Sequence, residues 1–169
     1  MGVMSAINLQ NYIHKIEMDE KTVIRRAPMV EAERAAAIRD ILQKNTFKII
    51  GNDHGPYYVR VGIENNALQF QVRDCLRNEL PVIALPLSPF RKLIKDYFLI
   101  CESFALAHSS HDRMRLQTID MARRGIHNEG ADILREQLDG KAELDFDTAR
   151  CLFTLICVLQ IGTQHRMAS

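Results

Sequence analysis

The sequence predicts an α+β fold in which an antiparallel meander of about four strands is covered on one face by helices. Two observations indicate this class. Segments with alternating apolar and polar residues lie between residues 47 and 87, and sequences rich in Gly, Asn and Pro interrupt them. One helical pattern precedes this block, and about three follow it. Because helices and strands are segregated along the chain, the pattern favours α+β over a doubly wound parallel sheet.

The first elements are a short strand and a helix. Imperfect alternation predicts a strand over about residues 12–18. A helix is expected over about residues 30–44, behind Pro28, because its Ala, Ile and Leu residues favour helix and form one apolar stripe. Asn45 is suited to end this helix in a left-handed conformation.

Four strands are expected in the next block, over residues 47–50, 57–63, 68–72 and 82–87. Asn65 and Asn66 form a two-residue hairpin turn in this prediction, because Asn tolerates a positive φ. One face of the meander would be buried. The other would carry Arg60, Gln69 and Gln71 towards solvent or a partner.

The three following helices are expected to pack on one face of the sheet. Ser88 as a hydroxyl cap and Pro89 in the first turn start a helix that reaches about residue 108. A second helix covers about residues 113–138, and Gly140 is placed to end it. The last helix, with Asp145 as its cap, reaches about residue 162 and is the expected centre of the core.

Length and composition predict a single domain of 169 residues, ordered over about residues 7–162. With 47% hydrophobic and 25% charged residues, the chain has the balance of a soluble globular protein. Its net charge of +1 argues against broad phosphate neutralisation, and therefore against nucleic acid as a partner. The longest apolar run, residues 151–161, is shorter than the roughly 20 residues of a membrane span, so no membrane segment is expected.

The sequence lacks the common motifs of catalysis and metal binding. It contains no Gly-rich phosphate loop, no nucleophile elbow and no regular Cys and His spacing, so we expect neither cofactor nor metal. Cys101 lies in an apolar setting that keeps a thiol unreactive. Free thiols together with the lack of an export signal in the first 30 residues indicate a cytoplasmic protein.

The most polar stretch, residues 119–131, lies inside a helical pattern. At about 100° per residue, Arg123, Arg124 and His127 fall in one sector beside an apolar face. We predict a binding surface here, joined by residues of the preceding helix. Its members are Arg123, Arg124, His127, Asn128, Glu129, Lys95 and Glu102.

A structural interpretation of the same stretch remains open. Asp120 and Arg124 are spaced to pair across one helical turn on a solvated face. Gly125 and Gly130 would then allow another helix to approach closely.

Two functional hypotheses follow. The leading one is a non-enzymatic interaction or regulatory module that binds a protein partner or a small anionic ligand. The alternative is a small enzyme acting on a phosphorylated or otherwise anionic substrate, in which arginines hold the anion and His127 is the general acid or base. The Arg-to-His spacing is shorter than in the helical ribonuclease domains that it partly resembles. Whether the protein is an enzyme, and whether it forms a homo-oligomer, are left open.

Long segments resemble a bacterial family of unknown function, uncharacterised protein family number two-six-two. The resemblance covers about residues 13–160 and is carried by SPFRKLIKDYFLICESF, IDMARRGIHNEGADIL and LDFDTARCLFTLICVL, with VEAERAAAI and FKIIGNDHGPYYVRVGIE upstream. It implies a small intracellular bacterial protein. It supplies no activity and no catalytic residues.

Overall fold

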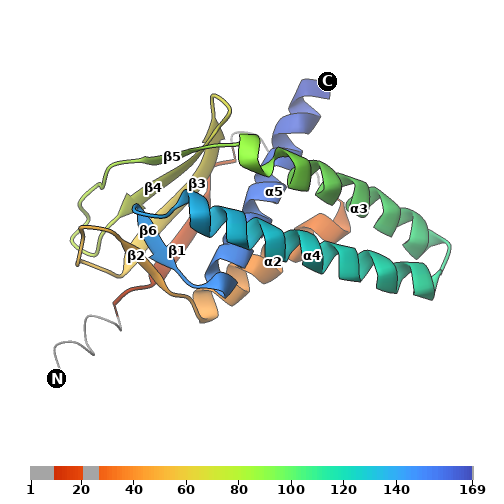
Figure 1. Ribbon diagram of the computed structural model, residues 1–169, viewed down its shortest axis with the longest axis horizontal. Coiled ribbons are helices and arrows are strands. Elements are labelled where there is room, and N and C mark those ends of the chain that lie inside the picture. The colour runs from red at the N-terminus through yellow and green to blue at the C-terminus, as the bar shows by residue number, and fades with distance from the viewer. Residues whose placement is uncertain (1–9, 21–26, 169) are drawn as a thin grey trace.

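A computed structural model describes residues 10–20 and 27–168, with side chains up to Gln160. A mixed sheet lies on one side of the molecule and the helices lie on the other (Figure 1). The α+β class predicted from the segregated pattern is therefore confirmed. Residues 7–9, which we expected to be ordered, lie outside the described residues.

The main sheet has the strand order β1-β3-β4-β5, formed by β1 (Ile13–Met18), β3 (Tyr57–Glu64), β4 (Ala67–Arg73) and β5 (Ile83–Pro86). The β3–β4 and β4–β5 pairs are antiparallel, as predicted, but β1 pairs with β3 in parallel. The simple meander is thus corrected to a mixed sheet. Helix α2 (Pro28–Gln43) lies between β1 and β3 in the chain and supplies the crossover that a parallel pair requires.

Strand β2 (Phe47–Ile49) is not part of that sheet. It pairs antiparallel with β6 (Ala142–Leu144), a three-residue strand that the sequence did not indicate. The partners are almost one hundred residues apart, and so short a strand leaves little alternation to detect.

The turn between β3 and β4 follows the sequence prediction. Asn65 and Asn66 have φ values of 53° and 59°, the left-handed conformations of a type I′ hairpin. This register turns Val59, Val61 and Phe70 inwards to the core, where each is at most 2% exposed. Their neighbours along the strands point to the opposite face.

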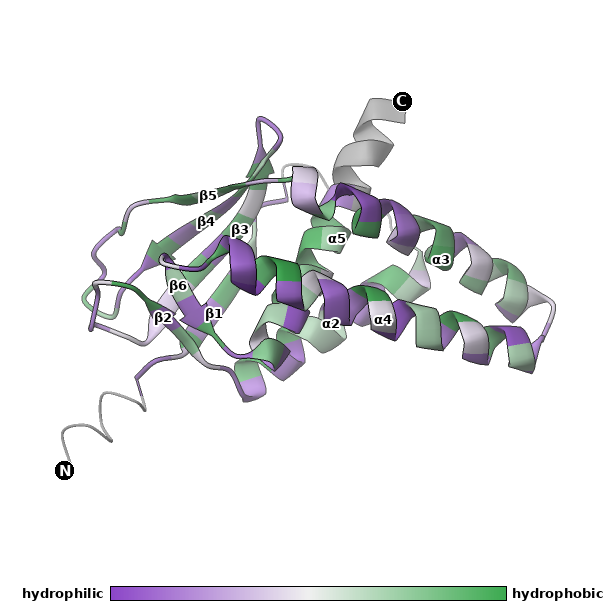
Figure 2. Ribbon diagram, viewed as in Figure 1, coloured by the Kyte–Doolittle hydropathy of each residue, from purple (hydrophilic) through white to green (hydrophobic). Residues whose placement is uncertain are grey.

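The helices of the second half are α3 (Arg91–Ser109), α4 (Arg113–Gln137) and α5 (Phe146–Ala168), with a 3₁₀ turn, η1 (Ser88–Phe90), before α3. Helix α5 contacts β3, α2, α3 and α4, so the expected core helix is central. The described part of α5 is strongly apolar where these elements surround it (Figure 2). Helices α3 and α4 pack on α5 rather than directly on the sheet, which refines the predicted arrangement.

The predicted helix ends are partly confirmed. Asp145 accepts a hydrogen bond from the Thr148 amide at 3.0 Å, and Gly140 has a φ of 77° just after α4. Ser88 makes no capping hydrogen bond, because it is itself the first residue of the 3₁₀ turn. Helix α5 continues past the predicted end at residue 162.

Asn45 ends α2 by a different route from the one predicted. Its amide nitrogen donates to the carbonyls of Ile41 and Ile13, at 2.6 and 3.0 Å, and its side-chain oxygen accepts from the Ile13 amide at 2.6 Å. The side chain therefore joins the end of α2 to β1.

Among the described helices, none is both long and apolar enough to cross a bilayer.

Candidate functional site

Polar side chains gather in two separate places. One is a network between the helices, which we call the helical network: Glu33, Tyr97, Asp120, Arg123, His127 and Thr154. The other is a hollow on the outer face of the sheet, which we call the sheet hollow. Its side chains come from β1, β3, β4 and the segment between β4 and β5.

Arg123 is the centre of the helical network. One terminal nitrogen donates to Glu33 on α2 at 3.1 Å, and its Nε and other terminal nitrogen donate to Asp120 at 3.2 and 2.7 Å. Tyr97 on α3 donates its hydroxyl proton to the second oxygen of Glu33. The guanidinium is thus occupied by two carboxylates of the same molecule and fastens α4 to α2.

His127 lies inside the helical layer, with the residue 1% exposed. Its ring packs edge-on against Tyr97 and Phe153, with centroid distances of 5.5 and 5.9 Å. The sequence-based enzyme hypothesis requires a pocket that opens on this ring. The burial of His127 corrects that expectation.

Thr154 contacts the ring of His127. The Thr154 hydroxyl donates to the Arg150 carbonyl at 3.1 Å, and its oxygen also lies 3.1 Å from Nδ1 of His127. Nε2 has no hydrogen-bond partner among the described residues and lies 3.9 Å from a Glu33 oxygen.

Glu33 is ionised in this setting. Burial raises the pKa of its carboxyl, but the neighbouring His127 ring, the Tyr97 hydroxyl and Arg123 outweigh that effect and hold the pKa below its usual value. Burial also raises the pKa of the nearby Cys101 thiol to about 11, with the charge of Glu33 acting in the same direction. This agrees with the unreactive thiol expected from the sequence.

The remaining predicted site residues do not form one surface with His127. Arg124 pairs with Asp120 at 3.0 Å, as the structural interpretation expected, and Asn128 accepts from Arg150 at 3.1 Å. Exposed side chains complete the predicted set, and a binding role for them stays a prediction: Glu129, Lys95 and Glu102.

The structural role predicted for the two glycines holds for one of them. A Cβ on Gly130 would overlap the ring of Phe153, so glycine is what lets α5 approach α4. A Cβ on Gly125 would meet no atom within 4 Å. Gly125 is therefore not needed for packing.

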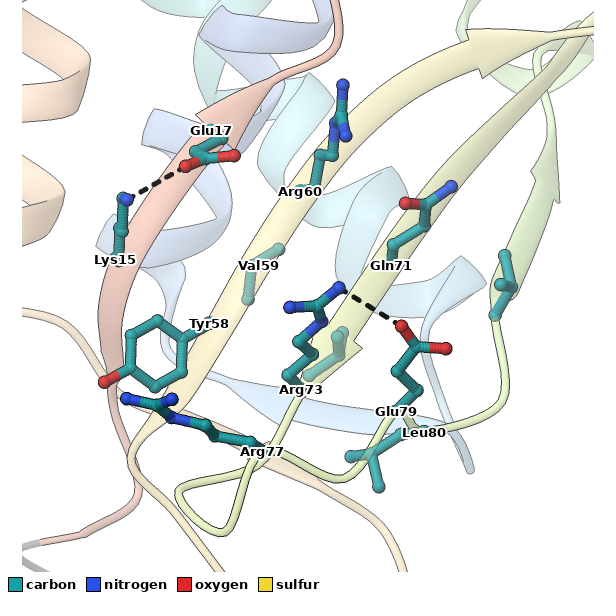
Figure 3. Close-up of a pocket in the computed structure, with 12 residues that line it drawn as sticks. Lys15, Glu17, Tyr58, Val59, Arg60, Gln71, Arg73, Arg77, Glu79 and Leu80 are labelled. Atoms are coloured by element: carbon teal, nitrogen blue, oxygen red, sulfur yellow. Dashed lines mark hydrogen bonds and ion pairs between the residues drawn. The ribbon is translucent and has the colours of Figure 1, made fainter.

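The sheet hollow has a volume of about 560 Å³ and lies on the face turned away from the helices (Figure 3). Figure 3 shows that the side chains of Lys15, Tyr58 and Arg73 lie on the same side of the strands. Four cations and two carboxylates line the hollow: Lys15, Arg60, Arg73, Arg77, Glu17 and Glu79. Arg60 also pairs with Asp19 at 3.1 Å, which leaves one positive charge in excess. Arg60 and Gln71 were expected on this outer face, and both are exposed there.

The strand register aligns these side chains in rows across the sheet. Tyr58 lies between Lys15 on β1 and Arg73 on β4, because it is the pairing partner of both. A register shift between Ile13 and Lys15 leaves His14 exposed beside Lys15. The His14 ring then contacts Tyr58 edge-on, with a centroid distance of 5.5 Å.

Most of the charges in the sheet hollow are paired at its surface. Lys15 lies 3.0 Å from Glu17 and Arg73 lies 3.1 Å from Glu79. The hydrogen bond and charge of Lys15 lower the pKa of the Glu17 carboxyl. Exposed pairs of this kind contribute little stability, so an incoming anion can displace the carboxylates at small cost.

Arg77 is the exception in this cluster. Among the described residues, no carboxylate lies within 4.0 Å of its guanidinium, and its φ is 66°. Figure 3 shows its side chain extending along the rim towards Tyr58. Nothing in the sequence indicated that the Arg77 side chain would face the strands.

Asp74 holds the turn that carries Arg77. It is 1% exposed and accepts hydrogen bonds from the amides of Leu76 and Asn78, both at 3.0 Å, and from the side chain of Asn52 at 3.2 Å. Burial raises the pKa of the Asp74 carboxyl, but these hydrogen bonds outweigh it and keep the pKa below its usual value. The turn is therefore fixed by a buried anion.

Comparison with known proteins identifies relatives over nearly the whole chain. The family model described as "Uncharacterised protein family (UPF0262)" matches residues 10–162. A UPF0262 protein of Paramagnetospirillum magneticum is 49% identical over 147 residues, covering 87% of this chain and 94% of the relative. UPF0262 proteins of Rhodospirillum rubrum and Hyphomonas neptunium are 48% and 45% identical, covering 88% and 90% of this chain and 92% and 94% of the relatives. No solved structure matches the chain.

Proposed function

Because the chain belongs to the bacterial uncharacterised protein family UPF0262, whose description assigns no activity, we propose a function from geometry alone: a non-enzymatic interaction module that recognises an anionic group through the sheet hollow. One observation carries the proposal. Arg77 is held in a left-handed backbone conformation at the rim of a 560 Å³ hollow with excess positive charge, and it has no carboxylate partner among the described residues.

The backbone conformation of Arg77 supports a functional role. A non-glycine residue in the left-handed region costs about 1 kcal/mol or more, and such conformations persist where the surroundings enforce them. Here the buried Asp74 enforces it. The Arg77 side chain is held in place although its backbone conformation is unfavourable, and it makes no ion pair with any residue that the structure describes. It is therefore available for an outside anion.

The helical network supports binding over catalysis. Arg123 is already paired with Glu33 and Asp120, and His127 is buried. An anionic substrate would have to displace two carboxylates to reach this arginine. Breaking a partly buried pair of this kind is costly, whereas displacing Glu17 or Glu79 at the surface is not.

Amide chemical-shift mapping tests the proposal. A ¹⁵N-labelled sample is titrated with inorganic phosphate and, separately, with a poly-glutamate peptide. We expect the largest shifts at Lys15, Tyr58, Arg73 and Arg77, weakening as salt is raised. An Arg77→Gly variant should lose most of them, and Arg124→Ala, on the solvated face of α4, should retain them. Shifts centred on α4, or no shifts with either probe, would refute the proposal.

A further inference from the structure

One corner of the sheet hollow combines an exposed aromatic ring with cations. Tyr58 is 38% exposed, whereas the adjacent Tyr57 is completely buried. Lys15 and Arg73 flank Tyr58 in the register, and the side chain of Arg77 approaches it from the rim (Figure 3). An aromatic face surrounded by positive charge is the arrangement that binds a planar ring carrying an anion.

The ring of Tyr58 is held in place before any ligand arrives. His14 packs against it at an interplanar angle of 73°, and the register shift in β1 puts His14 there. A ring held by a neighbour loses little conformational freedom when a second ring stacks on it. Tyr58 is therefore suited to be a stacking platform, beyond its place in the sheet.

The volume of the hollow is that of a small-molecule site. Its volume of about 560 Å³ lies within the roughly 300–1,000 Å³ of such sites. Leu80 and Val82 add apolar surface on the opposite side, with Val82 52% exposed. A simple inorganic anion would use the cations but leave this apolar surface and the Tyr58 ring unused.

The charges that line the hollow favour a ligand with a single anionic group over a polyanion. Glu17 and Glu79 lie among the cations of the hollow and would repel a continuous run of phosphates. The net charge of the chain is only +1. One phosphoryl group can be met by Arg77 and Arg73, since guanidinium groups bind phosphate through paired hydrogen bonds.

We propose that the sheet hollow binds a mononucleotide-type ligand, with a planar base stacked on Tyr58 and a phosphoryl group held by Arg77 and Arg73. This rests on the proposed function and names its ligand class. Recognition of the base is by stacking, so the site discriminates a ring from no ring more strongly than one base from another.

Titration calorimetry with adenosine monophosphate, adenosine and inorganic phosphate tests this proposal. We expect adenosine monophosphate to bind at least about tenfold more tightly than either component, because ring and anion are then held together. Tyr58→Leu should weaken its binding about tenfold or more, and Tyr58→Phe should keep it, since only the ring is needed. Arg77→Gly should weaken adenosine monophosphate and phosphate but not adenosine. Thermal melts of each variant verify folding.

The outcomes separate this inference from the function on which it rests. If phosphate or poly-glutamate binds at the hollow while adenosine monophosphate gains nothing from its base, the ligand class is wrong and the anion-binding module stands. If wild type and Tyr58→Leu bind adenosine monophosphate equally well, the ligand class is again wrong and the anion-binding module stands. If none of the probes binds, both proposals fail.

Discussion

Arg77 adopts a left-handed conformation in which its Cβ crowds the backbone, and glycine would adopt it without that penalty. We expect Arg77→Gly to be as stable as wild type or up to about 1 kcal/mol more stable, while losing anion binding. Urea denaturation measures the stability. A variant clearly less stable than wild type would show that the Arg77 side chain holds the fold together, contrary to a binding role.

Glu33 links stability to pH. Its pKa is lowered in the folded protein, so its contribution is fully present above the unfolded value of about 4.3 and is lost as the pH falls through the folded pKa. We expect Glu33→Gln to be less stable than wild type at pH 7 and to lose less stability on acidification. Thermal melts between about pH 7 and 3 measure this. Parallel pH curves for the two proteins would contradict it.

At the scale of elements, the close contact between α4 and α5 depends on the absence of a Cβ atom at Gly130. Gly130→Ala places a Cβ against the ring of Phe153, and we expect it to cost about 1–3 kcal/mol through overpacking. Gly125→Ala is the matched control on the same helix. It meets open space and should stabilise by about 0.5–1 kcal/mol through helix propensity. Equal effects in chemical denaturation would invalidate this assignment.

The two neighbouring arginines of α4 should behave differently. Arg123→Ala leaves the Glu33 carboxylate without its cation, and we expect a loss of about 2–4 kcal/mol, or roughly 5–15 °C in melting temperature. Arg124→Ala removes an exposed pair across one helical turn and should cost about 0.3–0.5 kcal/mol. Differential scanning calorimetry compares them. Similar melting temperatures would mean that Arg123 does not fasten α4 to α2.

The sequence predicted what depends on local pattern. Helical periodicity located α2 to α5, alternation located β3 and β4, and the Asn65-Asn66 turn was identified by its tolerance of positive φ. The pairing of β1 with β3 and of β2 with β6 was not predictable, because alternation determines which face a strand buries and not which strand lies beside it.

The same limit applies to the candidate site, because local pattern does not show which distant residues lie side by side. Residues 119–131 were predicted to provide a binding surface, but the carboxylate that neutralises Arg123 comes from Glu33, which is 90 residues away. The local pattern therefore suggested a binding surface, whereas in the fold Arg123 makes an internal ion pair between α4 and α2. Arg60 and Gln71 pointed to the outer sheet face, while Arg77 required the turn geometry that only the fold supplies.

On the scale of the whole molecule, the two faces of the sheet are used differently. The inner face is closed by helices that are fastened to one another through Arg123 and packed closely at Gly130. In the part of the chain that the structure describes, no helix covers the outer face, which carries the larger part of its charge in weak pairs and contains one unpaired arginine. The stabilising contacts thus lie on the helical side, and we propose the outer face as the binding side.

The most direct test of this division is the affinity of Arg77→Gly and Arg124→Ala for the same anion, measured side by side with wild type by calorimetry at low salt. We expect Arg77→Gly to lose about tenfold or more in affinity, because a charge-assisted hydrogen bond is removed, and Arg124→Ala to match wild type. Unchanged affinity in Arg77→Gly together with a loss in Arg124→Ala would move the binding surface to α4 and contradict the role of the sheet.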